Sequence, residues 1–395
     1  MLPGTPFHSR TAPLNQGQNW RRWAGYLAAS AYDLSPEREY WAVRNTAALF
    51  DVSPLYKYLI SGPDAARLLD RIVTRRIDRC AIGQVLYTPW CDEAGKVIDD
   101  GTVARLDEQT FRLTSADPNL RWLHQNAVGQ RVTIRDVSAS TAALALQGPH
   151  ARLILQQVSP ADFDQLKYFR LTHTRIDDIP VTITRTGYTG DLGYELWADA
   201  ADAERLWDAL RRAGQGYGLT PAGILALDVA RVEAGLLLIE VDYQSARHAL
   251  IEAQRSSPLE LGLGWTVALD KGAFIGRRAL AAEQARGPAW QFVGLEVEWK
   301  GLERLYAAEG LPPQLPATTV RASVPVAAQG RQVGYATSLT WSPLLKKLLA
   351  LAHLESGSAQ LGNLVMLEVT VQHQRRYAPA RVVKTPFFDP ERKKA

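Results

Sequence analysis

Two stretches of the sequence combine acidic side chains with residues that can shape a binding surface. The first, residues 186–196, contains three glycines, two tyrosines and the carboxylate Glu195. Glycine allows a ligand to approach the backbone closely, and the ring of Tyr188 can stack on a flat ligand. Glu195 can accept hydrogen bonds from ring N–H groups. The stretch is therefore either a plain glycine-rich β-hairpin or one wall of a pocket.

The second stretch is the adjacent pair Asp99 and Asp100, inside a strand expected over residues 97–106. Successive side chains of a strand point to opposite faces, so the two carboxylates must separate. Asp100 shares a face with Ile98 and Thr102 and should turn inward, where a carboxylate is costly unless something pairs with it. The other carboxylate can meet solvent. Two surface acids beside a turn are the alternative interpretation.

The surrounding patterns place both stretches in an α+β fold. Residues 84–90 and 97–106 should pair as one hairpin, and residues 181–185 and 194–197 as another. One long strand is expected over residues 48–60. Apolar spacing and capping residues predict helices over residues 36–43, 65–72, 117–124, 201–214, 222–234 and 275–285.

The chain also shows signs of internal division. A strand-Gly-Pro-helix pattern occurs at residues 62–63 and again at 148–149, which hints at two related α+β halves. From residue 291 onward, short strands at even spacing suggest a small barrel or sandwich. We expect a catalytic region over residues 1–287 and a separate unit over residues 288–395.

Composition narrows the functional classes. The 395 residues are 46% hydrophobic and 22% charged, as in a soluble globular protein. The formal net charge of +4 does not indicate a nucleic-acid partner. Cys80 and Cys91 should be reduced, and the seven scattered histidines lack zinc-site spacing, so no metal is expected. With no signal-peptide pattern and no apolar run of about 18 residues, we expect a cytoplasmic protein without a membrane partner.

Short motifs occur along the chain in a characteristic order. The Asp-Asp hairpin is followed by Arg-Thr-Gly-Tyr-Thr-Gly at 185–190, Arg-Val-Glu-Ala-Gly-Leu at 231–236 and Ser-Pro-Leu-Glu-Leu-Gly-Leu-Gly-Trp at 257–265. Weaker matches lie at 41–44, 50–53, 95–100, 146–149, 274–277, 333–335 and 342–343. Together they resemble the glycine-cleavage T-protein (aminomethyltransferase) family over most of the chain. The chain looks like a divergent member, related to tetrahydrofolate-dependent demethylases.

The resemblance implies an α+β aminomethyltransferase fold with two interlocked domains and a C-terminal β-barrel, arranged like a clover leaf around a folate channel. Tetrahydrofolate is the implied cofactor, and Asp100 is the implied catalytic residue, facing the reactive part of the pterin. An inward carboxylate can stabilise positive charge as a carbon moves, and can help to shuttle protons. The implied folate-binding positions are Tyr87, Ser115, Tyr188, Glu195 and Trp265.

The sequence departs from the family pattern on the side of the site that would hold the carbon donor. Leu227 stands where glycine-cleavage members have an arginine, and Leu55 replaces the methionine of the usual His-Met pair. Extra residues between positions 242 and 258 place more polar side chains beside the expected pocket. The expected substrate-side residues are Leu55, Tyr56, Leu227, Tyr243, Arg247 and His248.

We therefore expect a transferase or demethylase that moves a methyl or methylene unit from a small methylated or aminomethyl substrate to N5 of tetrahydrofolate. One alternative is a glycine-cleavage aminomethyltransferase that acts on a lipoyl carrier protein. Another is a non-enzymatic folate-binding protein, although the Lys-Gly-Cys-Tyr-x-Gly-Gln-Glu motif of related iron–sulfur repair proteins is absent. The sequence leaves open the donor, the choice between methyl and methylene transfer, and the oligomeric state.

Overall fold

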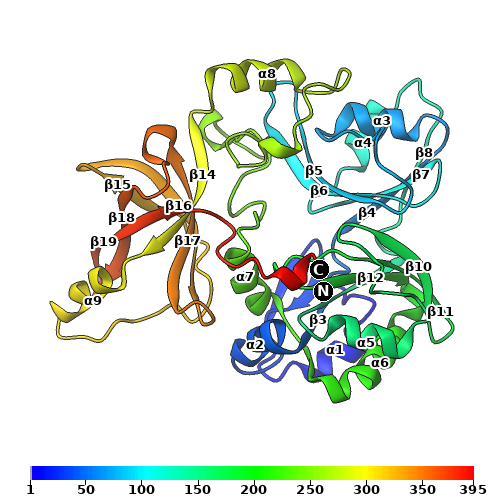
Figure 1. Ribbon diagram of the computed structural model, residues 1–395, viewed down its shortest axis with the longest axis horizontal. Helices are drawn as coiled ribbons and strands as arrows, with labels where there is room; N and C mark the ends of the chain where they lie inside the picture. The colour runs from blue at the N-terminus through cyan, green and yellow to red at the C-terminus, as the bar shows by residue number, and fades with distance from the viewer. Residues whose placement is uncertain (1) are drawn as a thin grey trace.

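The structure is a computed structural model that describes residues 2–395. It has three lobes around a common centre (Figure 1): a six-stranded sheet with helices, a five-stranded sheet with helices, and a closed barrel. The predicted α+β class and the C-terminal barrel are confirmed. No helix within the described residues is long and apolar enough to cross a membrane.

The first lobe is built on a sheet of strand order β10-β11-β12-β9-β3-β13. Its elements are β3 (Ala47–Asp51), β9 (Thr141–Gln147), α5 (Ala151–Val158), β10 (Leu171–Ile176), β11 (Ile179–Thr184), β12 (Gly193–Asp199), α6 (Ala203–Gly214) and β13 (Leu219–Pro221). Helices α5 and α6 cover one face, where Leu144, Leu196 and Trp207 are buried. The opposite face carries Phe50 and Trp197 in a second apolar cluster. This second face is turned toward the centre of the molecule (Figure 1).

The second lobe has strand order β5-β6-β7-β4-β8. Its elements are β4 (Tyr56–Ser61), α3 (Ala65–Ile72), β5 (Val85–Cys91), β6 (Val97–Arg105), β7 (Thr110–Ser115), α4 (Leu120–Asn126) and β8 (Thr133–Asp136). The single strand predicted over residues 48–60 is wrong, because the chain leaves the first sheet after Asp51 and enters the second at Tyr56. Pro54 lies in this crossing, and proline cannot donate a ladder hydrogen bond.

The third lobe is a closed barrel of strand order β14-β17-β16-β15-β18-β19. Its elements are β14 (Trp290–Val297), α9 (Trp299–Ala307), β15 (Val324–Ala328), β16 (Arg331–Ser342), β17 (Lys347–Glu355), β18 (Leu364–Val371) and β19 (Gln374–Val383). Closure leaves no free sheet edge, and the interior is filled by side chains such as Leu295, Ala350 and Val382. The sequence did not predict α9, which packs on β19 where Gly301 meets Pro379.

The remaining elements join the lobes. They are α1 (His8–Thr11), β1 (Trp20–Trp23), β2 (Tyr26–Ala29), α2 (Glu37–Asn45), α7 (Ile224–Glu233) and α8 (Arg277–Arg286), with short 3-10 helices η1 (Ala12–Leu14), η2 (Ala200–Asp202), η3 (Gln215–Tyr217), η4 (Glu252–Gln254), η5 (Gly264–Thr266), η6 (Ser356–Ser358) and η7 (Glu391–Lys393). Arg231 of α7 donates to Asp242 and, at 2.7 Å, to Ser338 of the barrel. The segment after β19 returns to the first lobe, where Arg392 pairs with Asp191 at 2.7 Å.

Candidate functional site

Two tyrosine hydroxyls donate to the Asp100 carboxylate. Tyr87, on the neighbouring strand β5, donates to Oδ2 at 2.8 Å, and Tyr243, in the loop after α7, donates to Oδ1. Asp100 is half-buried, and Tyr243 is buried. The structure therefore brings together the expected catalytic residue Asp100, the expected folate-binding residue Tyr87 and the expected substrate-side residue Tyr243.

Burial sets the protonation of this cluster. It raises the pKa of Asp100, while the hydrogen bonds from Tyr243 and Tyr87 favour the charged carboxylate and limit that rise. Burial, and then the charge of Asp100, raises the pKa of Tyr243 well above its usual value. Both hydroxyls consequently keep their protons at neutral pH and act as fixed donors.

Asp99 does not meet solvent, contrary to the expectation for this pair. Its side chain is 0% exposed. The carboxylate accepts from the backbone N–H groups of Asp100 at 2.8 Å and Asp117 at 3.0 Å, and from the side-chain amide of Asn119 at 2.9 Å. These donors compensate for the cost of burial. Asp99 thereby holds the loop between β7 and α4 against the back of the strand that carries Asp100.

Trp265 forms an exposed platform beside the cluster. Its ring stacks on Tyr87, with centroids 6.3 Å apart and planes inclined by 28°. The guanidinium carbon of Arg75 lies 5.3 Å from the centre of the Trp265 ring. Trp265 is 64% exposed, so this aromatic face is available to a flat ligand.

The glycine-rich stretch is a longer loop than predicted. Strand β11 ends at Thr184 and β12 begins at Gly193, so residues 185–192 connect them. The Tyr188 hydroxyl donates to the carbonyl of Leu237, just after α7. Gly190 has a φ of +73°, and a Cβ there would lie 2.5 Å from the Ala234 side chain. Close contact with the end of α7 therefore requires this glycine.

Glu195 extends from β12 on the central face of the first lobe. Its Oε2 accepts from the hydroxyls of Thr186 at 2.6 Å and Thr184 at 3.4 Å. Burial raises the pKa of Glu195, and these hydroxyls together with the charge of Arg112 oppose the rise. Within residues 2–395, no hydrogen bond reaches Oε1, which leaves an acceptor for a ligand.

Sequence reasoning missed Arg112, which is 6% exposed on β7. Its guanidinium carbon lies 3.9 Å from the centre of the Trp197 ring. No carboxylate of the described chain lies within 4.0 Å of it, and its Nε has no hydrogen-bond partner there. Burial lowers the pKa of Arg112 to about 10, against the opposing effect of Glu195. No signal in the sequence sets this arginine apart, because strand β7 also carries the polar residues Thr110, Thr114 and Ser115.

The placement of Ser115 differs from the expectation. Its hydroxyl is buried and donates to the carbonyl of Asp117 at 2.8 Å, behind the sheet. Strand side chains alternate, so Thr114 is the β7 residue on the face of Asp100, and it lies 2.5 Å from the Thr102 hydroxyl. Thr114, rather than Ser115, therefore lies on the side that can meet a ligand.

The six expected substrate-side residues separate into groups. Leu55 and Leu227 are half-buried and pack on the apolar cluster of Trp197. Tyr56, by contrast, packs against the core of the second lobe. Tyr243 is the member of the group that contacts Asp100.

Arg247 and His248 are exposed, and their hydrogen-bond and ion-pair partners within residues 2–395 do not include Asp100. Arg247 donates to the Asn119 side chain at 3.1 Å, and His248 Nδ1 is 3.4 Å from a carboxylate oxygen of Asp117. The structure thus ties both side chains to the region behind the Asp100 strand. A metal ion could take ligand atoms from Asp117, Glu240 and His248, which lie within 4.8 Å of one another. Two of these three side chains are exposed.

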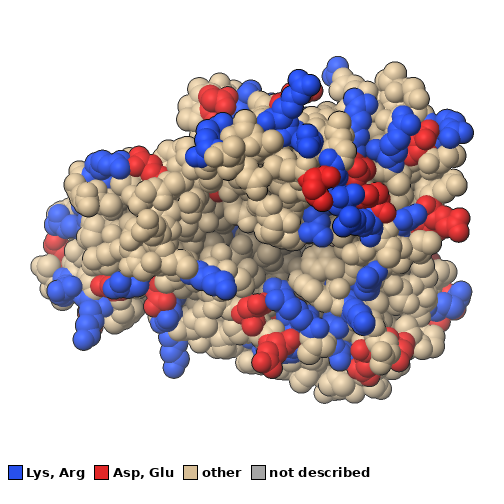
Figure 2. Space-filling view, turned by 45° about the horizontal axis from the view of Figure 1, so that its top comes forward, with Lys and Arg blue, Asp and Glu red and all other residues tan. Residues whose placement is uncertain are grey.

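The surface view shows a hollow near the middle of the molecule (Figure 2). Most residues in it are uncharged, whereas lysine, arginine, aspartate and glutamate alternate around it. Opposite charges are interspersed on this face, with no continuous basic stripe of the kind that tracks a nucleic-acid backbone.

Comparisons with known proteins place the whole chain in one group. The model of the GCVT N-terminal domain matches residues 7–271, and that of the glycine cleavage T-protein C-terminal barrel domain matches residues 310–389. A solved structure, the glycine cleavage system aminomethyltransferase T from Bartonella henselae, superimposes with a TM-score of 0.83 at 23% identity, covering 98% of this chain and 99% of that one. This match shows the shared fold.

Sequence similarity to curated relatives points to the same family. The aminomethyltransferase of Moorella thermoacetica is 37% identical over 94% of both chains, and that of Halothermothrix orenii is 35% identical over 89% of this chain and 90% of that one. The trimethylamine-oxide aldolase of Ruegeria pomeroyi is 33% identical over 99% of this chain, which spans 48% of that protein. The chain belongs to the glycine cleavage T-protein family.

Proposed function

We propose that this protein is a tetrahydrofolate-dependent transferase or demethylase that moves a one-carbon unit from a small methylated or aminomethyl donor to N5 of the folate. The observation that carries the proposal is the Asp100 carboxylate, held by the hydroxyls of Tyr87 and Tyr243. Relatives named aminomethyltransferase and trimethylamine-oxide aldolase support the same class of reaction.

The residues around the centre fit a pterin ring. The lactam edge of a pterin presents N–H donors beside a carbonyl acceptor. Within residues 2–395, Glu195 has a free acceptor oxygen that can receive these N–H donors. The buried guanidinium of Arg112 has no anionic partner there and can donate to the pterin carbonyl. Tyr188 and Trp265 offer rings that can pack on the faces of such a ligand. These four residues would hold tetrahydrofolate.

Tetrahydrofolate, when bound, supplies the nucleophilic N5 that receives the carbon. The Asp100 carboxylate stabilises positive charge that develops as the carbon leaves the donor. Its two tyrosine donors fix the orientation of the carboxylate and favour its charged form. Asp100 can also take up or return a proton, because burial raises its pKa.

The test is turnover with a panel of methylated amines, sulfonium compounds and aryl ethers, following methyl- or methylene-tetrahydrofolate by chromatography. We expect Asp100→Asn to lower turnover by roughly 10²–10⁴-fold, and to leave tetrahydrofolate affinity, measured by calorimetry, nearly unchanged. Asp270→Asn is the matched control, because that carboxylate is exposed and pairs with Arg76 on the surface. Full activity of the Asp100 variant would overturn the mechanism.

The second candidate is an aminomethyltransferase that acts on a lipoyl carrier protein. It is favoured by the similarity over most of the chain to curated aminomethyltransferases. The half-buried Leu227 argues against it, because it replaces the arginine of the glycine-cleavage pattern. Release of ammonia from a carrier loaded with an aminomethyl group, in the presence of tetrahydrofolate, would establish this activity.

A further inference from the structure

An open groove lies in the first lobe, between one face of α2 and the C-terminal end of α6. Its volume is about 700 Å³, and small-molecule sites typically enclose roughly 300–1,000 Å³. None of the residues assigned to the proposed folate and donor sites lines it. Its polar and aromatic lining consists of Arg38, Trp41, Asn45, Arg211, Arg212 and Gln215.

Regular spacing brings these side chains together. Arg38, Trp41 and Asn45 are three and seven positions apart on α2, so they lie on one face of that helix. Arg211 belongs to the last turn of α6. The floor between the two helices is the edge strand β13, whose residue Leu219 also lines the groove.

The groove carries positive charge without a matching acid. Three arginines line it, and no aspartate or glutamate of the described residues does. Arg212 pairs with Asp177 at 3.0 Å, outside the groove, and the exposed Arg38 comes only within 3.8 Å of Asp33. The remaining guanidinium, that of Arg211, is therefore the one to account for.

Arg211 is half-buried and lacks an anionic partner. Its Nη1 donates to the backbone carbonyl of Leu219 at 2.8 Å, and no carboxylate within residues 2–395 lies within 4.0 Å of it. Burial, and then the like charge of Arg38, lowers the pKa of Arg211. An anion between the two guanidinium groups would relieve this repulsion. A phosphate, with a charge of about −1.5 to −2, balances two arginines better than a single carboxylate does.

Trp41 adds a flat aromatic wall. It is half-buried, and it is not part of the apolar clusters that form the core of the first lobe. The edge of one ring meets the other between Trp41 and Tyr40, with centroids 5.3 Å apart and planes inclined by 69°. Within residues 2–395, the indole N–H of Trp41 has no hydrogen-bond acceptor. Both the ring and its N–H are thus available to a ligand.

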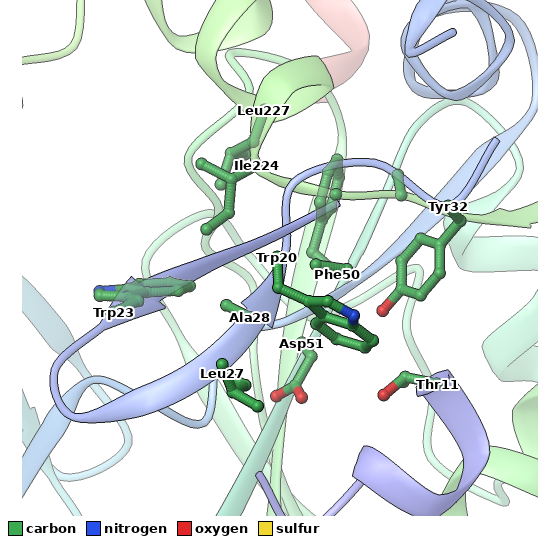
Figure 3. A pocket seen from close by; sticks show the side chains of 13 residues that line it. Thr11, Trp20, Trp23, Leu27, Ala28, Tyr32, Phe50, Asp51, Ile224 and Leu227 are labelled. Carbon is green, nitrogen blue, oxygen red and sulfur yellow. The ribbon is translucent and has the colours of Figure 1, made fainter. Parts of the chain in front are cut away.

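The hollow between the β1–β2 hairpin, β3 and the first turn of α7 offers no comparable space. Its volume is about 20 Å³, which is room for about one water molecule, and Trp20, Tyr32 and Phe50 surround it (Figure 3). It also contains the carboxylate of Asp51, which would repel an anion. The groove along α2 is the larger and the more positive of the two.

We propose that the groove along α2 binds a small phosphorylated ligand with a flat ring, such as a nucleotide, with its phosphate oxygens on Arg211 and Arg38 and its ring on Trp41. The planar fork of a guanidinium group matches the spacing of phosphate oxygens. The side-chain amides of Asn45 and Gln215 offer donors and acceptors for the edge of the ring. This inference goes beyond the proposed function and does not depend on it.

The test is calorimetric titration of the full-length protein, without folate, with ADP, pyrophosphate and adenosine. We expect ADP to bind with a Kd below about 1 mM, and each fragment to bind at least about tenfold more weakly. Added NaCl should weaken ADP binding, because the contacts to phosphate are electrostatic. Hydrogen exchange with ADP present should slow in α2 and stay unchanged in the β1–β2 hairpin.

Two variants test the contacts separately. Arg211→Gln should weaken ADP binding by about 10- to 100-fold, because it removes hydrogen bonds from a charged group. Trp41→Leu should weaken it by about 2- to 10-fold through loss of ring stacking. The matched controls are Arg205→Gln, which changes an arginine of the same helix that pairs with Asp202 at 2.9 Å, and Trp299→Leu on the barrel. Both controls should bind ADP as the parent does.

Thermal unfolding of each variant is measured first. If Arg211→Gln does not fold, Arg38→Gln replaces it, because the Arg38 side chain is 77% exposed, and it too should weaken ADP binding. Pyrophosphate that binds as tightly as ADP, or unchanged binding by the arginine and Trp41 variants, would overturn the inference. Loss of ADP binding when tetrahydrofolate is added would place ADP in the central site instead. A glutamate-rich peptide that binds more tightly than ADP would make the groove a docking site for an acidic protein segment, also against the inference.

Discussion

The Asp100 carboxylate has its two hydrogen-bond donors on residues that are far apart in sequence. Tyr87 comes from the paired strand, and Tyr243 from a loop more than a hundred residues later. Both donors favour the ionised acid, while burial opposes ionisation. The balance between these effects sets the pH at which Asp100 gains a proton, and each tyrosine hydroxyl can be removed without removing its ring.

Tyr243→Phe should lower turnover roughly tenfold to a hundredfold, because it removes one hydrogen bond to a charged group. Losing that donor also raises the pKa of Asp100 further. If transfer needs the ionised acid, activity falls as pH drops through this pKa, so the acidic limb of the rate profile should move to higher pH. A pH series of kcat measures both effects.

Tyr377→Phe is the matched control, because that tyrosine is exposed on the barrel. Tetrahydrofolate affinity should be the same for the parent and both variants. An acidic limb that does not move in Tyr243→Phe, with kcat unchanged, would show that the Tyr243 hydroxyl has no influence on Asp100 during turnover.

The alternation of side chains along a strand could predict that Asp99 and Asp100 point to opposite faces of the sheet, and that Asp100 turns inward. It could not predict the burial of Asp99, because the donors that permit it belong to Asp117 and Asn119, in a loop whose path depends on tertiary packing. The role of Arg112 could not be predicted from the sequence either. Its role depends on Trp197, which approaches from another lobe.

Among the elements, the loop of residues 185–192 shows how local chemistry and tertiary contact combine. The sequence shows its glycines, but the requirement for glycine arises from residues that pack against the loop in the folded protein. Gly190 combines a left-handed backbone with close approach to Ala234 at the end of α7. This contact holds the loop of Tyr188 against the helix that leads into the segment of Tyr243.

Gly190→Ala should therefore destabilise the protein by roughly 2–5 kcal/mol, from backbone strain together with the clash against Ala234. Gly330→Ala is the matched control, because Gly330 also has a positive φ, of +78°, but a Cβ there would meet no atom within 4 Å. It should cost only about 1–2 kcal/mol. Chemical denaturation of both variants measures the difference, and equal losses would mean that the contact with α7 contributes nothing.

Helices with clear apolar spacing were predictable to within a few residues, as α3 and α6 illustrate. The predictions of secondary structure are wrong where tertiary contacts determine the path of the chain. The crossing between β3 and β4 sends one apolar stretch to two sheets, and the regular structure in the loop between α7 and η5 is the short 3-10 helix η4. In that loop, side-chain contacts such as those of Tyr243 replace regular backbone structure.

For the whole molecule, the main question is what fixes the barrel relative to the other lobes. The proposed division at residue 287 falls between the end of α8 at Arg286 and the start of β14 at Trp290, and stays a prediction. Connections across it are polar and buried. Arg231 of α7 donates to Ser338 of the barrel, and Asp242 accepts from the hydroxyls of Thr337 and Ser338.

Arg231→Met tests this connection, because methionine fills similar space without charge. Asp228 and Asp242 are 2% and 0% exposed at the side chain and both pair with Arg231. Arg231 is the only cation paired with Asp242 within residues 2–395, whereas Asp228 would keep Arg321 at 2.7 Å. Removing one partner of a buried ion pair costs about 3–5 kcal/mol, since the other charge stays buried. We expect lower stability and faster hydrogen exchange in β16 than in the parent.

Arg331→Met is the matched control. Arg331 pairs with Glu355 on the barrel surface, with side chains 61% and 38% exposed, so its loss should change neither stability nor exchange in β16 appreciably. If Arg231→Met behaves like this control, the barrel must be held by other contacts, such as the return of the C-terminal segment to Asp191. If hydrogen exchange becomes faster in β16 but not in β12, Arg231 stabilises the contact between α7 and the barrel rather than the first lobe.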